Sequence, residues 1–291
     1  MARCAQGPGG LNRIVPIDDA DDPRIAAFRD VRDRDIAGRL GGFIAEGEVV
    51  LRVLARSRLH RARAILIAAK RLESLAPILS GFADDVPIYT AGQAAMDQIV
   101  GFPIHRGILA FGERAREVSA DALLGAIEGP ARLVALFGVA NHDNVGGVFR
   151  NAAAFGARAL LLDGACCDPL YRKAIRVSVG AALTVPFARF ASGEDPLDLL
   201  ARHGFAALAL SPSGAAPLAA LDPPRRTAVL LGAEGAGLPG AILERVATVA
   251  IPMASGFDSL NLATVSGIVL NHLAQRDAGR NDRGEPRGDQ P

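Results

Sequence analysis

Three polar segments stand out in this 291-residue sequence because packing alone does not explain their composition. The first segment, 141–150, follows an apolar run and leads into a predicted helix. Asn144 is placed to cap that helix, while Gly146 and Gly147 permit close backbone approach. Arg150 lies about two turns into the helix and places a cation on one of its faces.

The second segment, 230–240, surrounds Glu234 with glycines. Three of these, Gly235, Gly237 and Gly240, match the spacing of the G-x-G-x-x-G dinucleotide fingerprint. That fingerprint belongs to the first βα turn of its domain, whereas only about 50 residues follow here, too few for the usual βαβαβ half. We therefore interpret the segment as a glycine loop that lets Glu234 and several backbone N–H groups face a ligand.

The third segment, 251–261, begins where an apolar run ends in Pro252. A polar loop follows, and Ser259 stands where a helix would start. Taken alone, this pattern is typical of an ordinary strand–loop–helix junction. All three segments follow predicted strands, and strand ends are where open α/β sheets bind ligands.

Five short apolar runs must position these loops, and they span 133–139, 159–163, 206–210, 228–231 and 248–252. Continuous apolar runs that alternate with helix-length stretches predict a mostly parallel sheet covered on both faces. A last helix is expected over 259–275, where apolar residues recur at helical spacing.

A separate βα alternation precedes this region. Strands are expected near 43–47, 64–68, 86–89 and 107–111, with helices over 22–39, 48–56, 71–80 and 92–100. The chain is therefore predicted to be an α/β protein with five parts: a flexible N-terminal tail (1–20), a smaller α/β domain (21–114), a helical linker (115–130), a parallel-sheet domain (131–275) and a disordered tail (276–291).

Composition excludes several classes of protein. Half of the residues are hydrophobic and 22% are charged, as in globular proteins. Every long apolar stretch is broken within about 18 residues and the N-terminus lacks a secretory signal, so we expect a cytoplasmic protein without membrane spans. Cys4, Cys166 and Cys167 fit neither a disulfide framework nor a zinc site, so reduced thiols and no metal are expected. The net charge of +1 says little about a polyanionic partner.

In their order and spacing, the three segments resemble the signature motifs of the SpoU (TrmH-like) family, a branch of the SPOUT class of RNA methyltransferases. The matching residues are Asn144, Gly146 and Arg150 for N-x-G-x-x-x-R; Gly232, Glu234, Gly235, Gly237 and Leu238 for G-x-E-G-x-G-L; and Ile251, Pro252, Met253, Ser259, Leu260 and Asn261 for I-P-M followed by S-L-N. The resemblance covers residues 131–275. It implies a parallel-sheet SPOUT domain with a trefoil knot, an obligate homodimer with active sites at its interface, and methyl transfer from S-adenosylmethionine to a ribose 2′-oxygen of RNA.

The resemblance also implies residue roles. The residues expected to bind S-adenosylmethionine are Leu231, Gly232, Gly235, Ile251, Met253, Ser259 and Leu260. The polar set expected at the reacting groups is Asn144, Arg150, Glu234, Ser259 and Asn261. An arginine is almost always protonated, so Arg150 is expected to position ribose and phosphate unless local groups make it a base. Glu234 is expected either to orient Arg150 or to cap loop amides.

Residues 42–112 resemble, less specifically, the ribosomal-protein-L30e-like substrate-binding domain that often precedes this catalytic domain. Its usual closing H-Q-G stands here as His105-Arg106-Gly107. Contacts to the RNA backbone are expected from arginines of both domains: Arg52, Arg56, Arg58, Arg61, Arg63, Arg106 and Arg150. The front domain favours ribosomal RNA over transfer RNA, with single-stranded loops and bulges as targets.

Two alternatives stay open. One is an RNA- or ribosome-binding protein that keeps the fold without the reaction, which a cofactor titration would reveal. The other is methylation of a base, although the spacing of Asn144 and Arg150 favours the ribose branch. The sequence assigns no function to His142, Cys166 or Cys167.

Overall fold

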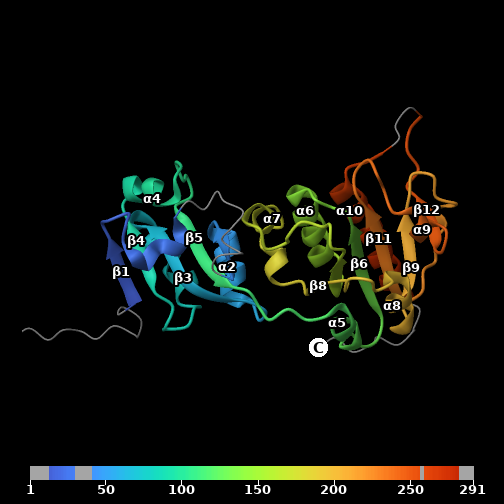
Figure 1. The fold of residues 1–291 in the computed structure, drawn as a ribbon, viewed down its shortest axis with the longest axis horizontal. Coiled ribbons are helices and arrows are strands. Elements are labelled where there is room, and N and C mark those ends of the chain that lie inside the picture. Colours follow the sequence, from blue (N-terminus) through green and yellow to red (C-terminus); the bar gives the residue numbers. More distant parts are fainter. Residues whose placement is uncertain (1–12, 30–40, 256–258, 282–291) are drawn as a thin grey trace, which may run out of the picture. The chain divides into compact units, whose positions relative to one another are not determined.

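The computed structural model describes residues 13–29, 41–255 and 259–281. The chain divides into two compact units, Met1–Ala115 and Arg116–Pro291, next to the expected domain end at 114. Each unit has its own β-sheet and its own hydrophobic core (Figure 1). No helix within the described ranges is long and apolar enough to cross a membrane.

The first unit is built on a five-stranded sheet. Its strand order is β1 (Ile14–Ile17), β4 (Ile88–Ala91), β3 (Arg61–Ala68), β5 (Ile108–Glu113) and β2 (Gly42–Glu46). The pairs β1–β4 and β3–β4 are parallel, whereas β5 is antiparallel to both of its neighbours. The accompanying helices are α2 (Glu48–Arg56), α3 (Leu72–Leu79) and α4 (Gln93–Val100). The four strands and three helices expected between 43 and 111 are all present.

The flexible tail expected over 1–20 is wrong for its described part, residues 13–20, and residues 1–12 of that prediction lie outside the described residues. Ile14–Ile17 forms β1, which pairs with β4 at the edge of the sheet. The Arg13 guanidinium donates hydrogen bonds to the carbonyls of Leu79, the last residue of α3, and of Phe82 and Ala83. Four residues with one proline give too short a pattern to identify an edge strand. Only the partner strand reveals it.

The prediction of a helix over 22–39 is also wrong within the described residues. A short 3-10 helix, Pro23–Phe28, begins at Asp22, whose side chain accepts a hydrogen bond from the Arg24 N–H. Arg29 has extended backbone, which ends the helix there. Residues 30–40 of that prediction lie outside the described residues.

The second unit is built on a seven-stranded sheet in which every neighbouring pair is parallel, and this confirms the predicted sheet type. Its strand order is β10 (Ala216–Pro217), β12 (Ala247–Ala250), β9 (Ala206–Leu210), β11 (Arg226–Gly232), β6 (Ala131–Phe137), β7 (Ala159–Leu162) and β8 (Phe187–Arg189). Strand β6, beside the middle strand β11, is buried along its whole length, as the apolar run over 133–139 predicts. The short strands β8 and β10 were not predicted.

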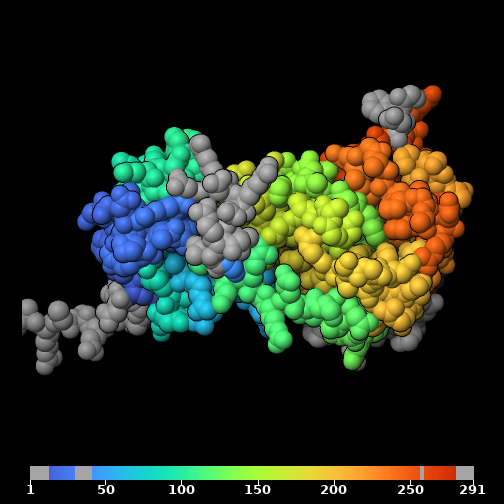
Figure 2. Space-filling view, viewed as in Figure 1, coloured from blue at the N-terminus to red at the C-terminus, as the bar shows by residue number. Residues whose placement is uncertain are grey.

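Six helices accompany this sheet: α5 (Ala120–Gly125), α6 (His142–Ala154), α7 (Arg172–Val177), α8 (Pro196–Arg202), α9 (Gly240–Leu243) and α10 (Leu262–Asn281). The orange segment of α9 and β12 lies at the surface beside the segment of α8 and β9 (Figure 2). Arg245 joins these segments through Asp195 and Asp198, at 2.5 and 2.8 Å.

Helices α6 and α10 pack closely because their contact residues are small (Figure 1). A Cβ added at Gly147 would lie 2.5 Å from the Cβ of Ala263. Asn151 donates hydrogen bonds from its amide to the Ala263 carbonyl at 2.6 Å and to the Ser266 hydroxyl at 2.9 Å. This contact brings the first and third sequence motifs together.

Two further boundaries differ from the sequence prediction. The helical linker expected over 115–130 does contain a helix, α5, but Ala120 and Leu124 of this helix belong to the core of the second unit. The disordered tail expected over 276–291 is wrong for residues 276–281, because α10 continues to Asn281, and the rest of that prediction lies outside the described residues. The last turns of α10 are held by Asp277, which forms an ion pair with the buried guanidinium of Arg132, and by Arg276, which donates to the Ala219 carbonyl.

Replacing Asp277 with alanine should lower the free energy of unfolding by about 1–3 kcal/mol, because a buried charge loses its partner. The Arg132 side chain is 5% exposed, and its guanidinium makes no well-aligned hydrogen bond within the described residues. Urea denaturation measures the change. The matched control is the double variant Arg132→Met with Asp277→Ala, which removes both charges and should regain most of the stability. An Asp277→Ala variant as stable as the wild type would contradict this role.

His60 should make the first unit sensitive to acid. Burial, together with the nearby charge of Arg114, lowers the pKa of His60 below its ordinary value of 6.5, and the ring accepts a hydrogen bond from the Ala115 N–H at 3.2 Å. The unfolded chain therefore takes up a proton at higher pH than the folded chain, so stability is full above about pH 6.5 and is lost as the pH falls toward the folded pKa. Between about pH 7.5 and pH 5, the melting temperature should fall more in the wild type than in a His60→Gln variant, which does not titrate. Equal falls would refute the assignment.

Candidate active site

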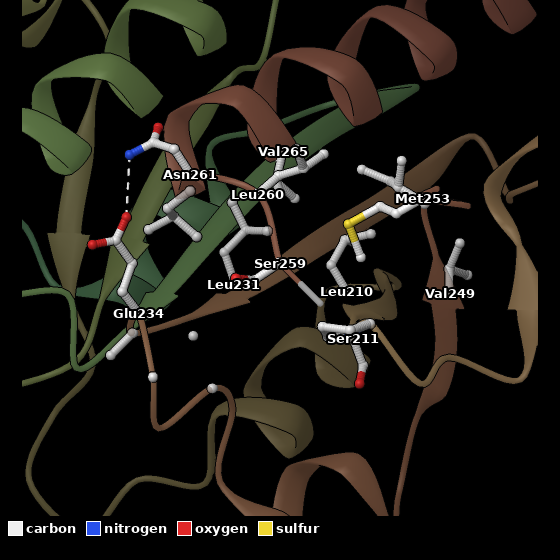
Figure 3. A pocket seen from close by; sticks show the side chains of 17 residues that line it. Leu210, Ser211, Leu231, Glu234, Val249, Met253, Ser259, Leu260, Asn261 and Val265 are labelled. Atoms are coloured by element: carbon white, nitrogen blue, oxygen red, sulfur yellow. Dashed lines mark hydrogen bonds between the residues drawn. The ribbon is translucent and has the colours of Figure 1, made fainter. Parts of the chain in front are cut away.

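A cavity of about 610 Å³ lies at the carboxyl ends of β9, β11 and β12 and is bordered by the start of α10 (Figure 3). This volume is within the range typical of small-ligand pockets. Seven of its lining residues are those that the motifs assigned to the cofactor: Leu231, Gly232, Gly235, Ile251, Met253, Ser259 and Leu260. They meet because parallel strands place their carboxyl ends at one edge of the sheet.

The cavity has an apolar end and a polar end. Leu210, Val249 and Met253 gather at one end, while Glu234 and Asn261 face each other at the other (Figure 3). The arrangement suits a ligand with a flat apolar part and a polar part.

Sequence reasoning missed one wall of the cavity, which consists of Leu210, Ser211 and Pro212 at the end of β9. The signal was present, because a polar Ser-Pro-Ser-Gly turn follows a predicted strand, as in the three motifs. Val249 and Val265 were also missed. Their apolar side chains carry no local signal of ligand contact.

The glycine loop after β11 folds back tightly on itself. A Cβ at Gly232 would lie 2.1 Å from the carbonyl carbon of Gly237, so no larger residue fits without a shift. Gly235 and Gly237 have positive φ angles of 85° and 70°, which favour glycine. The helix that follows, α9, has only four residues, unlike the helix of a dinucleotide fold. The loop therefore forms a tight turn that exposes Glu234 at the cavity.

Hydrogen bonds from one side chain join all three motifs. The Asn261 amide donates to Asn144 Oδ1 at 2.9 Å and to Glu234 Oε1 at 3.1 Å, and the latter bond is drawn in Figure 3. The Asn261 oxygen accepts from the backbone N–H of Ala263, which caps α10. Asn144 is 3% exposed and lies in the first turn of α6. The cap that was expected at Asn144 comes from Asn141, whose side chain accepts from the Asp143 N–H at 2.8 Å.

Arg150 is not brought to this cavity within one chain. Arg150 lies six positions after Asn144 on α6, so the two side chains point about 120° apart around the helix. Arg150 is exposed and lines a separate hollow of about 520 Å³ with Val177 and with residues of α10.

The hydrogen-bond partner of Glu234 is Asn261, and neither expected role of Glu234, orienting Arg150 or capping loop amides, is seen.

The cysteines of the second unit have the environment of structural thiols. Burial raises the pKa of Cys166 to about 12 and that of Cys167 to about 11, so both stay protonated near neutral pH. The Cys166 thiol donates to the Leu136 carbonyl at 3.3 Å. Across the described residues, no group of three or more histidine, cysteine or acidic side chains could hold a metal ion.

The arginine cluster expected to contact RNA in the first unit is partly neutralised. Arg52 pairs with Glu48 at 2.9 Å, Arg63 with Glu113 at 2.6 Å, and Arg61 with Asp85. Arg56, Arg58 and Arg106 are exposed. The periodicity of the sequence did not predict these ion pairs, because the acidic partners of Arg61 and Arg63 are distant in the chain.

The comparisons with known proteins agree with this geometry. The SpoU rRNA Methylase family matches residues 131–271, which include the glycine loop and the Asn261 network. An uncharacterized tRNA/rRNA methyltransferase of Mycobacterium tuberculosis is 39% identical over 279 residues, 92% of this chain and 94% of that protein. The chain belongs to the SpoU family of RNA methyltransferases.

Solved structures share the fold of this SpoU methyltransferase. An rRNA methyltransferase of Sinorhizobium meliloti is 24% identical, with a TM-score of 0.75 over 91% of this chain and 98% of that chain. The SpoU methyltransferase AviRb of Streptomyces viridochromogenes is 21% identical, with a TM-score of 0.74 over 89% and 99%. Both similarities extend across both units of the SpoU methyltransferase.

Proposed function

We propose that this SpoU methyltransferase transfers the methyl group of S-adenosylmethionine to a ribose 2′-hydroxyl of ribosomal RNA. The observation that carries the proposal is the hydrogen-bonded set of Asn144, Glu234 and Asn261 at the polar end of a ligand-sized cavity. A Sinorhizobium meliloti rRNA methyltransferase of the same fold has been solved with AdoMet bound, and another neighbour is titled an RNA 2′-O ribose methyltransferase.

The residues of the cavity fit S-adenosylmethionine. Leu210, Val249 and Met253 offer an apolar surface to an adenine ring, and Ser259 and Glu234 offer polar groups to the rest of the molecule. Bound there, S-adenosylmethionine supplies an electrophilic methyl group on a sulfonium. The tight turn at Gly232 keeps this wall of the cavity fixed.

The protein contributes mainly orientation. Methyl transfer is an in-line displacement, and correct placement of two reactants supplies a large part of such a rate. Asn144 holds Asn261, and Asn261 holds Glu234, so the polar end keeps one arrangement for the ribose hydroxyl. Glu234 is the one carboxylate among the described residues that line the cavity, and it is our candidate acceptor for the hydroxyl proton.

A homodimer is part of the proposal. The hollow around Arg150 is lined by small residues, Gly147, Ala263 and Gly267, which allow close approach of a second copy. Ile268 beside them is 38% exposed and would be buried by such a contact. Arg150 of the partner subunit would then reach the cavity and position ribose and phosphate.

We also propose the knot and the L30e-like assignment. In support of the knot, the chain passes from β11 across β9 to β12 and returns as α10 beside α6. In support of an RNA-binding first unit, Arg106 and Lys70 are exposed. Hydrogen bonds from the Ile104 N–H and from Gln93, with a smaller effect of the nearby Lys70, lower the pKa of the Asp97 carboxyl beside them. Arg106 and Lys70 are better candidates for phosphate contact than the paired arginines of β3. The free thiols of Cys166 and Cys167 fit a cytoplasmic location.

The experiment that tests the function is transfer of radiolabelled methyl from S-adenosylmethionine to RNA from a strain that lacks this gene. Ribosomal and transfer RNA are separated, digested and resolved into nucleosides. Label in a 2′-O-methylated nucleoside of ribosomal RNA is expected. Label in a base would place the enzyme in another branch, label in transfer RNA would correct the substrate, and cofactor binding without any label would favour a binding protein.

A further inference from the structure

An aromatic pair lies at the start of α6, outside the cavity. The rings of His142 and Tyr171 are 4.2 Å apart between centroids and tilted by 42°. Both side chains are half-buried, so part of each ring remains accessible. The chain has two tyrosines and no tryptophan, and the other tyrosine, Tyr89, is buried in the first unit. Tyr171 is therefore the one accessible tyrosine of the protein.

Cations accompany this pair. Helix α7, which directly follows Tyr171, carries Arg172, Lys173 and Arg176 in six residues. The Lys173 ammonium forms an ion pair with Asp143 at 2.6 Å, which ties α7 to the first turn of α6. Basic side chains next to accessible aromatic rings are the combination that binds single-stranded nucleic acid, because the rings stack on bases and the cations follow the phosphates.

The pair has a fixed place relative to the proposed reaction site. His142 begins α6, and Asn144 in the same turn accepts the hydrogen bond from Asn261. Gly146 then packs on α7, where an added Cβ would lie 2.7 Å from the Ala174 carbonyl. His142 and Asn144 thus lie in one helical turn with their side chains about 160° apart around α6, and Tyr171 contacts the His142 ring from the start of α7.

We propose that His142 and Tyr171 form a stacking platform for an unpaired base next to the ribose that is methylated, with α7 contacting the adjoining phosphates. This inference rests on the proposed function and adds the structural class of its substrate. A base inside an RNA helix is already stacked and unavailable, so the platform selects a loop or bulge.

Tyrosine fluorescence tests the platform directly in the full-length protein. A Tyr89→Phe variant leaves Tyr171 as the one tyrosine. A single-stranded oligouridylate should quench its emission, whereas a blunt RNA duplex of equal length should not. Stacking tolerates any base, so a failure of oligouridylate to bind overturns the proposal, as does binding without quenching or equal quenching by the duplex.

Substitution provides the second test. In the Tyr171→Ala variant, the dissociation constant for oligouridylate and the KM for RNA should rise about 10-fold or more. Tyr171→Phe is the matched control, since it keeps the ring, and it should bind like the wild type. Affinity for S-adenosylmethionine should stay unchanged in both variants, which shows that the cavity is intact. An unchanged oligouridylate affinity in both Tyr171→Ala and His142→Ala would refute the platform. A wild type that binds and quenches but labels no RNA would instead refute the proposed function.

Discussion

Replacing Arg150 with alanine should abolish methyl transfer to RNA while affinity for S-adenosylmethionine stays nearly unchanged. Arg150 is exposed and does not line the cavity of its own chain, so its loss leaves the cofactor walls in place. Removing it takes away the cation that we expect to position ribose and phosphate, an effect on turnover through orientation. Calorimetric titration of the cofactor and single-turnover methylation measure the two quantities separately.

The matched control is Arg158→Ala, another exposed arginine of the second unit, which should retain full activity. A fully active Arg150→Ala variant would remove Arg150 from the reaction. A parallel loss of cofactor affinity would instead mean that it supports the cavity of its own chain.

A mixing experiment locates the arginine more sharply. In the proposed homodimer, inactive Arg150→Ala and Asn261→Ala proteins that are dissociated and mixed would form mixed dimers in which one of two sites has an intact cavity and an intact partner arginine. Activity should therefore return to about one quarter of the wild-type level. No recovery despite dimer exchange would show that Arg150 acts within its own chain.

Replacing Gly232 with alanine should weaken binding of S-adenosylmethionine by about 5- to 150-fold, since forced overpacking typically costs about 1–3 kcal/mol. The added Cβ would lie 2.1 Å from the carbonyl carbon of Gly237 and 2.3 Å from the Leu238 nitrogen, both of them backbone atoms. The turn must open to relieve this overlap. Opening it displaces one wall of the cavity and moves Glu234 away from Asn261.

Gly240→Ala is the matched control on the same segment. A Cβ at Gly240 would meet no atom within 4 Å, and the residue begins α9, where alanine favours the helix. That variant should bind the cofactor like the wild type. If Gly232→Ala also bound it normally while remaining folded, the closed turn would not be needed for the cavity.

The sequence by itself determined the elements that local chemistry controls. Uninterrupted apolar runs predicted the central strands of the parallel sheet, such as β6, because a strand covered on both faces needs apolar residues throughout. Gly232 and Gly235 marked a tight turn because only glycine tolerates such close approach or positive φ. Each of these signals is contained within a few neighbouring residues.

The tertiary structure decided what depends on residues distant in the chain. Edge strand β1 exists only because β4 offers its hydrogen-bonding groups, and α10 continues past 276 because Asp277 meets a buried Arg132. The packing of α6 decides which side of the second unit carries Arg150. The charge of Arg63 is offset by an ion pair with Glu113, fifty residues away in the chain. Pairing, packing direction and charge compensation join separate segments, so no local pattern of residues contains them.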